Sequence, residues 1–175
     1  MEFAKYKPTA GFKFSVDGIH KCPVRTPCVA IYCRNPDGEY YQNTPKTDEI
    51  HLVSALDWNS PAESPRFNDG FYTYKNVAFE PNMHIIVDIQ TIIFGKTKKQ
   101  YKIKNVGWTI VPVFDKRQYV KSGIYQMPLF KGKISTELVE ALKEEDPWDF
   151  ITDLLKRRKI KLYKPCSVIV RLLDS

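Results

Sequence analysis

The fold is decided by the stretch Val106-Gly-Trp-Thr-Ile-Val-Pro-Val-Phe114, which is followed closely by Tyr119-Val-Lys-Ser-Gly-Ile-Tyr-Gln-Met-Pro-Leu-Phe-Lys-Gly132. Most residues in both runs are β-branched or aromatic, and such residues favour extended strands over helices. Gly107, Pro112 and Gly123 interrupt the runs at points where a strand can bend or turn. The stretch therefore predicts a sheet with tight corners.

Size and composition predict one globular domain. The chain has 175 residues, of which 43% are hydrophobic and 27% are charged, as in ordinary globular proteins. Apolar runs such as Cys28 to Cys33 are far shorter than the ~20 residues that a membrane-spanning helix needs. Residues Met1–Lys5 lack the hydrophobic region of a signal peptide. We expect a single cytoplasmic domain over residues 1–175, with residues 1–10 as a lead-in.

Several other segments have strand patterns, either alternating or continuously apolar and β-branched. They are Phe12–Val16, Cys28–Cys33, Glu49–Ser54, Met83–Phe94 and Ser167–Leu173. We expect the first strand to end at the turn Asp17-Gly18 and the last strand to begin after Pro165. The segment Lys96–Asn105 predicts a basic loop or strand that leads into the stretch quoted above.

One region near the end of the chain has a helical pattern instead. In Asp146-Pro-Trp-Asp149 an Asp precedes a Pro, which suits the N-cap and first position of a helix. Phe150, Ile151 and Leu154 then form an amphipathic stripe. We expect a helical insertion over residues 135–160, before the last strand. Without alternation of strands and helices, the sequence predicts an all-β, antiparallel sandwich.

The sequence also resembles a known family. Pro65-Arg-Phe-Asn-Asp-Gly-Phe71 resembles the C2-domain pattern that opens a central strand. A closer likeness is to the C2-like domains of ciliary and flagellar coiled-coil proteins, through Pro8–Gly18, Gly107-Trp108, Gly123–Phe130 and Ser167–Arg171. The resemblance implies an eight-stranded antiparallel C2-like β-sandwich. It also implies a calcium-independent module for protein interaction or scaffolding, with protein partners in a cilium, a flagellum or a related microtubule assembly of the cytoskeleton.

We expect no metal and no cofactor. C2 domains that bind calcium use several loop carboxylates, whereas here Asp88 is followed by Gln90 and Thr91, and the other acids are scattered at Asp37, Asp57 and Asp69. A zinc site would need His20, Cys22, Cys28 and Cys33, but Cys28 and Cys33 lie on opposite faces of a regular strand. With Cys166 as the fourth cysteine and no CxxC pair, we expect reduced thiols.

The net charge of +7 favours an acidic partner. One basic cluster consists of Lys96, Lys98, Lys99, Lys102 and Lys104. Each such residue near an anionic membrane contributes about 1 kcal/mol, so the cluster could bind phospholipids or phosphoinositides. Alternatively, these lysines only protect an exposed strand from aggregation.

A second basic cluster consists of Lys156, Arg157, Arg158, Lys159, Lys161 and Lys164. It could contact an acidic protein, or it could only compensate the dipole at the end of a helix. Neither cluster is accompanied by a nucleic-acid reader motif, so we do not expect nucleic-acid binding.

Enzymatic activity is not expected. The sequence contains no nucleophile elbow, phosphate-binding Gly-rich loop or His-Glu-x-x-His motif. A pairing of Cys22 or Cys166 with a distant His remains open. Large aromatics could form a peptide groove, although we expect most of them in the core. These aromatics are Trp108, Tyr119, Tyr125, Phe130 and Trp148. The oligomeric state remains open as well.

Overall fold

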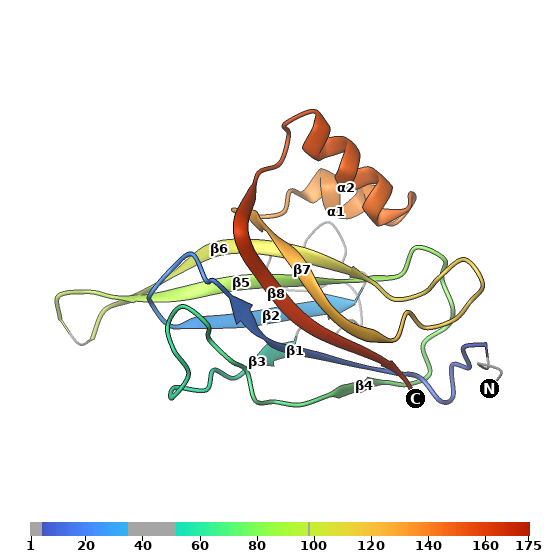
Figure 1. Cartoon of the computed structure of the whole chain (residues 1–175), viewed down its shortest axis with the longest axis horizontal. Coiled ribbons are helices and arrows are strands. Elements are labelled where there is room, and N and C mark those ends of the chain that lie inside the picture. Colours follow the sequence, from blue (N-terminus) through green and yellow to red (C-terminus); the bar gives the residue numbers. More distant parts are fainter. Residues whose placement is uncertain (1–4, 35–51, 98) are drawn as a thin grey trace.

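A computed structural model describes residues 5–34, 52–97 and 99–175, and these residues form eight strands and two helices (Figure 1). The strands are β1 (Phe12–His20), β2 (Cys28–Arg34), β3 (Leu52–Ser54), β4 (Tyr72–Tyr74), β5 (His84–Phe94), β6 (Tyr101–Pro112), β7 (Gly123–Lys131) and β8 (Leu162–Asp174). The helices are α1 (Thr136–Ala141) and α2 (Pro147–Lys156), between β7 and β8. The all-β class and the helical insertion before the last strand are therefore confirmed.

All strand pairs are antiparallel, in the order β3-β2-β5-β6-β7-β8-β1-β4. The pairing is weakest in the middle, where β6 and β7 share only the pairs Gly107↔Lys131 and Trp108↔Phe130. The sheet curls there, so that β7 and β8 cross over the layer of β2, β5 and β6 (Figure 1). The stretch that predicted tight corners thus contains the junction between the two halves of a sandwich-like sheet.

Gly107 makes this junction possible. A Cβ atom at residue 107 would lie 2.2 Å from the carbonyl oxygen of Phe130 and 3.0 Å from Cγ of Leu129. Any side chain there would separate the backbones of β6 and β7. The glycine is therefore required by close approach of two strands.

Both faces of the central strands are covered. Ile85, Val87 and Ile89 on β5 face the larger core inside the curled sheet. Ile86 on β5 and Trp108 on β6 face a second core on the outside, which the helices cover. Strands that are buried on both faces have nearly continuous apolar sequences. This explains why Met83–Phe94 alternates so little.

Capping residues define the starts of both helices. Ser135 precedes α1, and its hydroxyl accepts a hydrogen bond from the backbone N–H of Leu138. Asp146 precedes α2 and accepts hydrogen bonds from the N–H groups of Trp148 and Asp149. The predicted Asp cap with Pro147 at the helix start is confirmed.

Two predicted strand boundaries are wrong. β1 does not end at Asp17-Gly18 but continues to His20, because a bulge between Val16 and Gly18 absorbs the turn residues. β8 begins at Leu162, before Pro165. Its pairing with β7 shifts register near this proline, and proline is tolerated in strands at such irregularities.

The other differences are smaller. The C2-like pattern Pro65–Phe71 implies that the next strand is central. That strand, β4, instead lies at the edge of the described sheet and pairs there with β1. β3 confirms the end of the strand expected over Glu49–Ser54, whereas residues 49–51 lie outside the described residues.

Candidate functional site

The β5–β6 hairpin extends beyond the rest of the sheet (Figure 1). We call residues 92–104 the arm. β2 pairs with β5 only as far as Cys28↔Thr91, and β7 meets β6 only from Gly107 onwards. The arm is therefore a two-stranded ribbon, and the pairs Ile92↔Ile103 and Phe94↔Tyr101 hold it together. It is anchored at its base by a hydrogen bond from the Ile92 N–H to the carbonyl oxygen of Pro27.

One face of the arm is apolar and exposed. Residues directly opposite each other in an antiparallel pair share a face, so Phe94 and Tyr101 lie beside each other, next to Ile92 and Ile103. The exposed fractions are 61% for Phe94, 69% for Tyr101 and 55% for Ile103. Large apolar side chains that gather at the surface mark a binding site more often than isolated ones do.

Four of the five predicted lysines are among the described residues of the arm, near its tip or on the face opposite the apolar one. Lys96 and Lys99 are exposed near the tip of the arm, whereas Lys98 lies outside the described residues. Lys102 and Lys104 are exposed and share the opposite face of the ribbon, as predicted from their spacing. The structure thus brings the first basic cluster together with apolar side chains.

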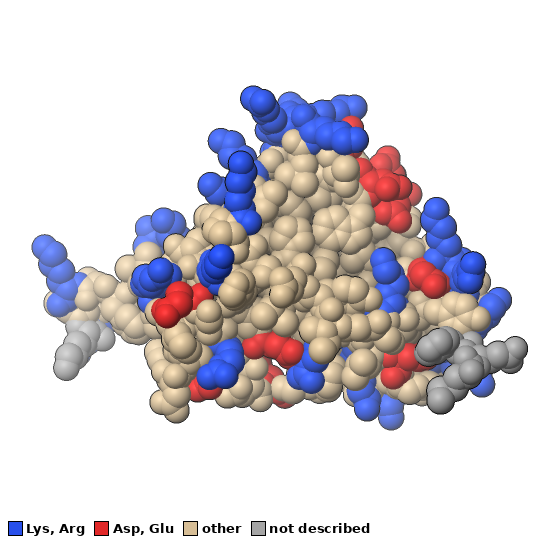
Figure 2. Space-filling model, in the orientation of Figure 1, with Lys and Arg blue, Asp and Glu red and all other residues tan. Residues whose placement is uncertain are grey.

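The second basic cluster is exposed at the end of α2, in the connection to β8 and at the start of β8. Its residues are Lys156, Arg157, Arg158, Lys159, Lys161 and Lys164. Arg157 forms an ion pair with Asp153 at 3.1 Å. The start of β8 lies close to the base of the arm, because the hydroxyl of Tyr163 donates a hydrogen bond to the Val106 carbonyl. Figure 2 shows Lys and Arg side chains over the helices and down the slope that faces the arm.

The carboxylates considered for calcium are bonded to other protein groups. Asp88 is buried and accepts hydrogen bonds from the side-chain amides of Gln90, at 2.8 Å, and Asn105. Asp57 and Asp69 accept backbone N–H groups of their own loops, and Asp37 lies outside the described residues. These hydrogen bonds give Asp57, Asp69 and Asp88 structural roles.

Cys28 and Cys33 lie on opposite faces of β2, as predicted. Cys22 and Cys28 are in the inner core, whereas Cys33 is in the outer core and His20 is exposed. Within residues 5–34, 52–97 and 99–175, no group of three or more His, Cys, Asp or Glu side chains could hold a metal ion. His84 is fully buried, and burial lowers its pKa to about 4, which suits a structural residue.

The five large aromatics singled out in the sequence are buried or half-buried. Trp108 and Phe130 are buried against each other, with ring centroids 4.7 Å apart. Tyr119, Tyr125 and Trp148 are half-buried. Among the residues that the structure describes, the exposed aromatics are Phe94 and Tyr101 in the arm and Trp58 in the β3–β4 loop, and sequence reasoning missed all three. Phe94 and Tyr101 are exposed because β5 and β6 extend past the strands beside them, and the sequence does not show where those neighbouring strands end.

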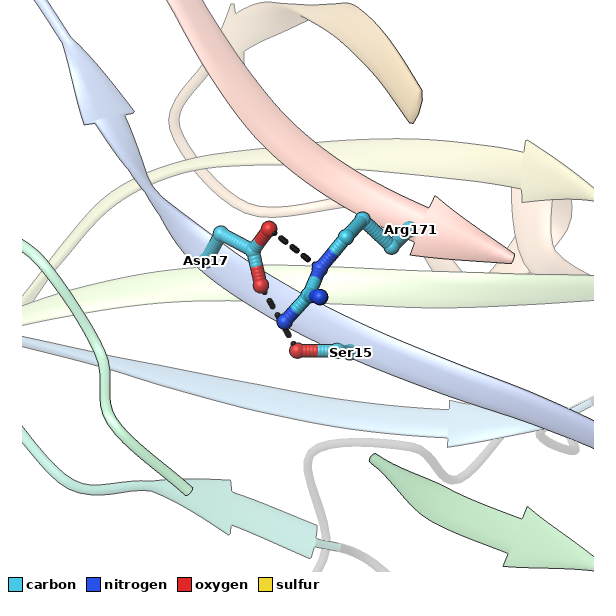
Figure 3. Close-up of polar contacts among 3 residues, drawn as sticks. All are labelled: Ser15, Asp17 and Arg171. Atoms are coloured by element: carbon cyan, nitrogen blue, oxygen red, sulfur yellow. Dashed lines mark hydrogen bonds and ion pairs between the residues drawn. The ribbon is translucent and has the colours of Figure 1, made fainter. Parts of the chain in front are cut away.

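A polar cluster on β1 and β8 has a different role (Figure 3). Asp17 accepts a hydrogen bond from the Ser15 hydroxyl at 2.8 Å and forms an ion pair with Nε of Arg171 at 2.6 Å. The Arg171 guanidinium also lies over the Phe71 ring, 4.4 Å from its centroid. Because these groups satisfy one another across two paired strands, the cluster stabilises the sheet at the β1 bulge.

The chain was compared with models of known protein families and with curated proteins, and neither comparison gave a match. The described helices, α1 and α2, are too short and too polar to cross a bilayer. The working surface is therefore inferred from the residues of the arm and their surroundings.

Proposed function

We propose that the chain is a non-catalytic, calcium-independent, C2-like attachment module that binds anionic phospholipid membranes through the arm. The observation that carries this proposal is the apolar face of Phe94, Tyr101 and Ile103, exposed on a projecting hairpin that also bears lysines. Aromatic and aliphatic side chains enter the interface between headgroups and acyl chains, while lysines contact the lipid phosphates.

The energies are sufficient for reversible binding. Lys99, Lys102 and Lys104 together contribute about 3 kcal/mol near an anionic surface. Full burial of a large apolar side chain contributes roughly 1.5–3 kcal/mol, and the arm presents several such side chains that are more than half exposed. Both contributions act at the arm, with the apolar side chains on one face of the ribbon and Lys102 and Lys104 on the other.

The proposal is tested by sedimentation with phosphatidylserine and phosphoinositide vesicles, with phosphatidylcholine vesicles as the neutral reference. Changing Lys99, Lys102 and Lys104 together to Gln should weaken binding by roughly 150-fold at low salt, which corresponds to about 3 kcal/mol. The matched control changes Lys116, Arg117 and Lys121 to Gln. These residues are also exposed, but they lie in the β6–β7 connection at the opposite end of β6.

A second variant separates insertion from charge. Changing Phe94 and Tyr101 to Ser should weaken binding roughly tenfold or more while leaving its salt dependence unchanged, because only charge is screened by salt. Failure of the natural protein to sediment with anionic vesicles would overturn the proposal. Equal losses in the arm variant and in the control would also do so, because net charge alone would then explain binding.

A second candidate function is protein scaffolding in a cilium, a flagellum or a related microtubule assembly, as the C2-like resemblance implies. A groove between the helices favours it. Leu138, Ala141, Phe150 and Leu154 line a cavity of about 300 Å³ that also borders Lys159. An apolar groove beside the second basic cluster suits an acidic amphipathic segment of a partner protein.

This candidate is tested by proximity labelling in ciliated cells. The natural protein should label axonemal or basal-body neighbours, and Ala141→Glu should lose them because it places a negative charge in the groove. The same variant should retain vesicle binding, since Ala141 is not part of the arm. Absence of ciliary neighbours for the natural protein would reject this function.

A further inference from the structure

Two cysteines that are separate in the sequence lie beside each other near the base of the arm. The Sγ atoms of Cys22 and Cys28 are 3.8 Å apart, and both side chains are buried in the inner core. Cys166 belongs to the same core, whereas Cys33 faces the outer core. The four thiols are therefore not equivalent, and only Cys22 and Cys28 are in sulfur contact at a hydrogen-bonding distance.

The surroundings of the pair distinguish the two sulfurs. Cys22 shares a hydrogen bond with Cys28 and accepts one from the backbone N–H of Val24, and Arg25 lies nearby. These contacts outweigh the effect of burial and lower the pKa of Cys22 to about 7. The same contact and burial raise the pKa of Cys28. One thiolate stabilised by a neighbouring thiol is the arrangement that thiol–disulfide chemistry requires.

A cavity reaches the Cys28 side of the pair, and Cys22 lies in sulfur contact behind it. Cys28 lines a cavity of about 150 Å³, together with Arg25 and Pro27 of the β1–β2 connection and Trp58 of the β3–β4 loop. This volume admits a molecule as small as a peroxide. The route is formed by loops, which can move more easily than the strands.

We propose that Cys22 and Cys28 form a reversible disulfide, with a peroxide as the oxidant. The Cys22 thiolate attacks a peroxide oxygen, the O–O bond breaks, and the hydroxide that leaves takes up a proton to become water. The product is a Cys22 sulfenic acid. The Cys28 sulfur then attacks the Cys22 sulfur, the S–O bond breaks, and the departing hydroxide takes the Cys28 proton. Two thiols are oxidised, and one hydrogen peroxide is reduced to two waters.

Closure needs a local movement. The sulfurs must approach from 3.8 Å to about 2.05 Å, the length of a disulfide bond. The five residues between the cysteines form part of a connection that is bonded to β5. The Pro27 carbonyl accepts hydrogen bonds from the Ile92 N–H, at 3.0 Å, and from the Thr91 hydroxyl, at 2.8 Å. The disulfide therefore cross-links the segment that anchors the arm. Its formation is independent of what the arm binds.

Peptide mapping after oxidation tests the disulfide. Trypsin cleaves after Lys21, Arg25 and Arg34, which places Cys22 in one peptide and both Cys28 and Cys33 in the next. The Cys33→Ser variant is therefore used, so that a link between the two peptides identifies Cys28. After reduction, removal of the reductant and treatment with hydrogen peroxide, the intact protein should lose two hydrogen atoms in mass and regain them with dithiothreitol.

Single variants test the order of the steps. Cys28→Ser should accumulate a sulfenic acid on Cys22 that dimedone traps, whereas Cys22→Ser should give no such adduct at Cys28. Formation of a Cys22–Cys166 bond instead, or retention of both free thiols under native conditions, would overturn the proposal. Hydrogen exchange at the Ile92 amide reports on the arm. Slower exchange after oxidation supports cross-linking of its anchor, and unchanged exchange refutes that part.

Discussion

Replacing Gly107 by Ala should destabilise the fold more than a glycine-to-alanine change at a position where the added Cβ meets no other atom. The new Cβ would lie 2.2 Å from the Phe130 carbonyl oxygen, and real contacts of this kind essentially never fall below 3.0 Å. The strands β6 and β7 must therefore separate by about 1 Å, which breaks hydrogen bonds that tolerate only a few tenths of an ångström. Gly107 belongs to one of the two residue pairs that join β6 to β7.

The expected loss of stability is about 3 kcal/mol, from one or two hydrogen bonds at about 1 kcal/mol each and overpacking of 1–3 kcal/mol. In a domain of this size, that corresponds to a decrease in Tm of roughly 6–12 °C. The change is measured by urea unfolding and by thermal melting followed by circular dichroism. A lowered midpoint with an unchanged m-value would indicate that the native state is destabilised.

The matched control is Gly70→Ala. Gly70 has a φ of +72° and no atom within 4 Å of an added Cβ, so it should cost only the left-handed backbone penalty of about 1 kcal/mol. The difference between the two variants isolates the close approach of β6 and β7. If Gly107→Ala loses no more stability than Gly70→Ala, the junction is not held by that approach and the reasoning is refuted.

Further predictions concern single side chains, and urea unfolding measures each of them. Stability should fall by about 2 kcal/mol between pH 7.5 and pH 5, because His84 has a pKa of about 4 when folded and about 6.5 when unfolded, so the unfolded state takes up the proton first. His84→Gln should remove this component, and an unchanged pH profile would contradict it. Asp146→Ala should lose about 1 kcal/mol through the missing N-cap, and Asp146→Asn should retain most of it. Arg171→Gln should lose at most about 1 kcal/mol, because its ion pair with Asp17 is partly exposed. A larger loss would show that the cluster contributes more than a surface pair.

The pattern of the sequence was sufficient for the class of fold. The β-branched runs of β5 and β6 and the Asp146-Pro147 cap depend on local preferences, and these preferences agree with the tertiary structure. The two wrong strand boundaries have another origin. At Asp17-Gly18 and at Pro165 the chain contains residues that end strands locally, but pairing with β8 and β7 continues past them through shifts of register. Such shifts depend on partner strands that are distant in the sequence.

The candidate site could be predicted only in part, for the same reason. The lysines of the arm were recognised from their density and spacing. Their apolar neighbours were not, because Phe94 ends a run that otherwise reads as core and Ile103 lies in a segment that was interpreted only as basic. Their exposure follows from where β2 and β7 stop pairing, at Thr91 and Gly107. The contact between Cys22 and Cys28 likewise depends on the path of the loop between them.

The positions of side chains in the arm distinguish two roles for its lysines, namely protection of an exposed strand edge and binding of a partner. Lys102 and Lys104 lie on one face of the ribbon, and Phe94 and Tyr101 lie on the other. Protective lysines would be expected to interrupt the apolar face, whereas these leave it open. Along the same face of β5, Ile86 is covered by the helices. The exposed apolar face of the arm therefore supports the proposal that a partner covers it, and the lysines on the reverse face favour an anionic partner.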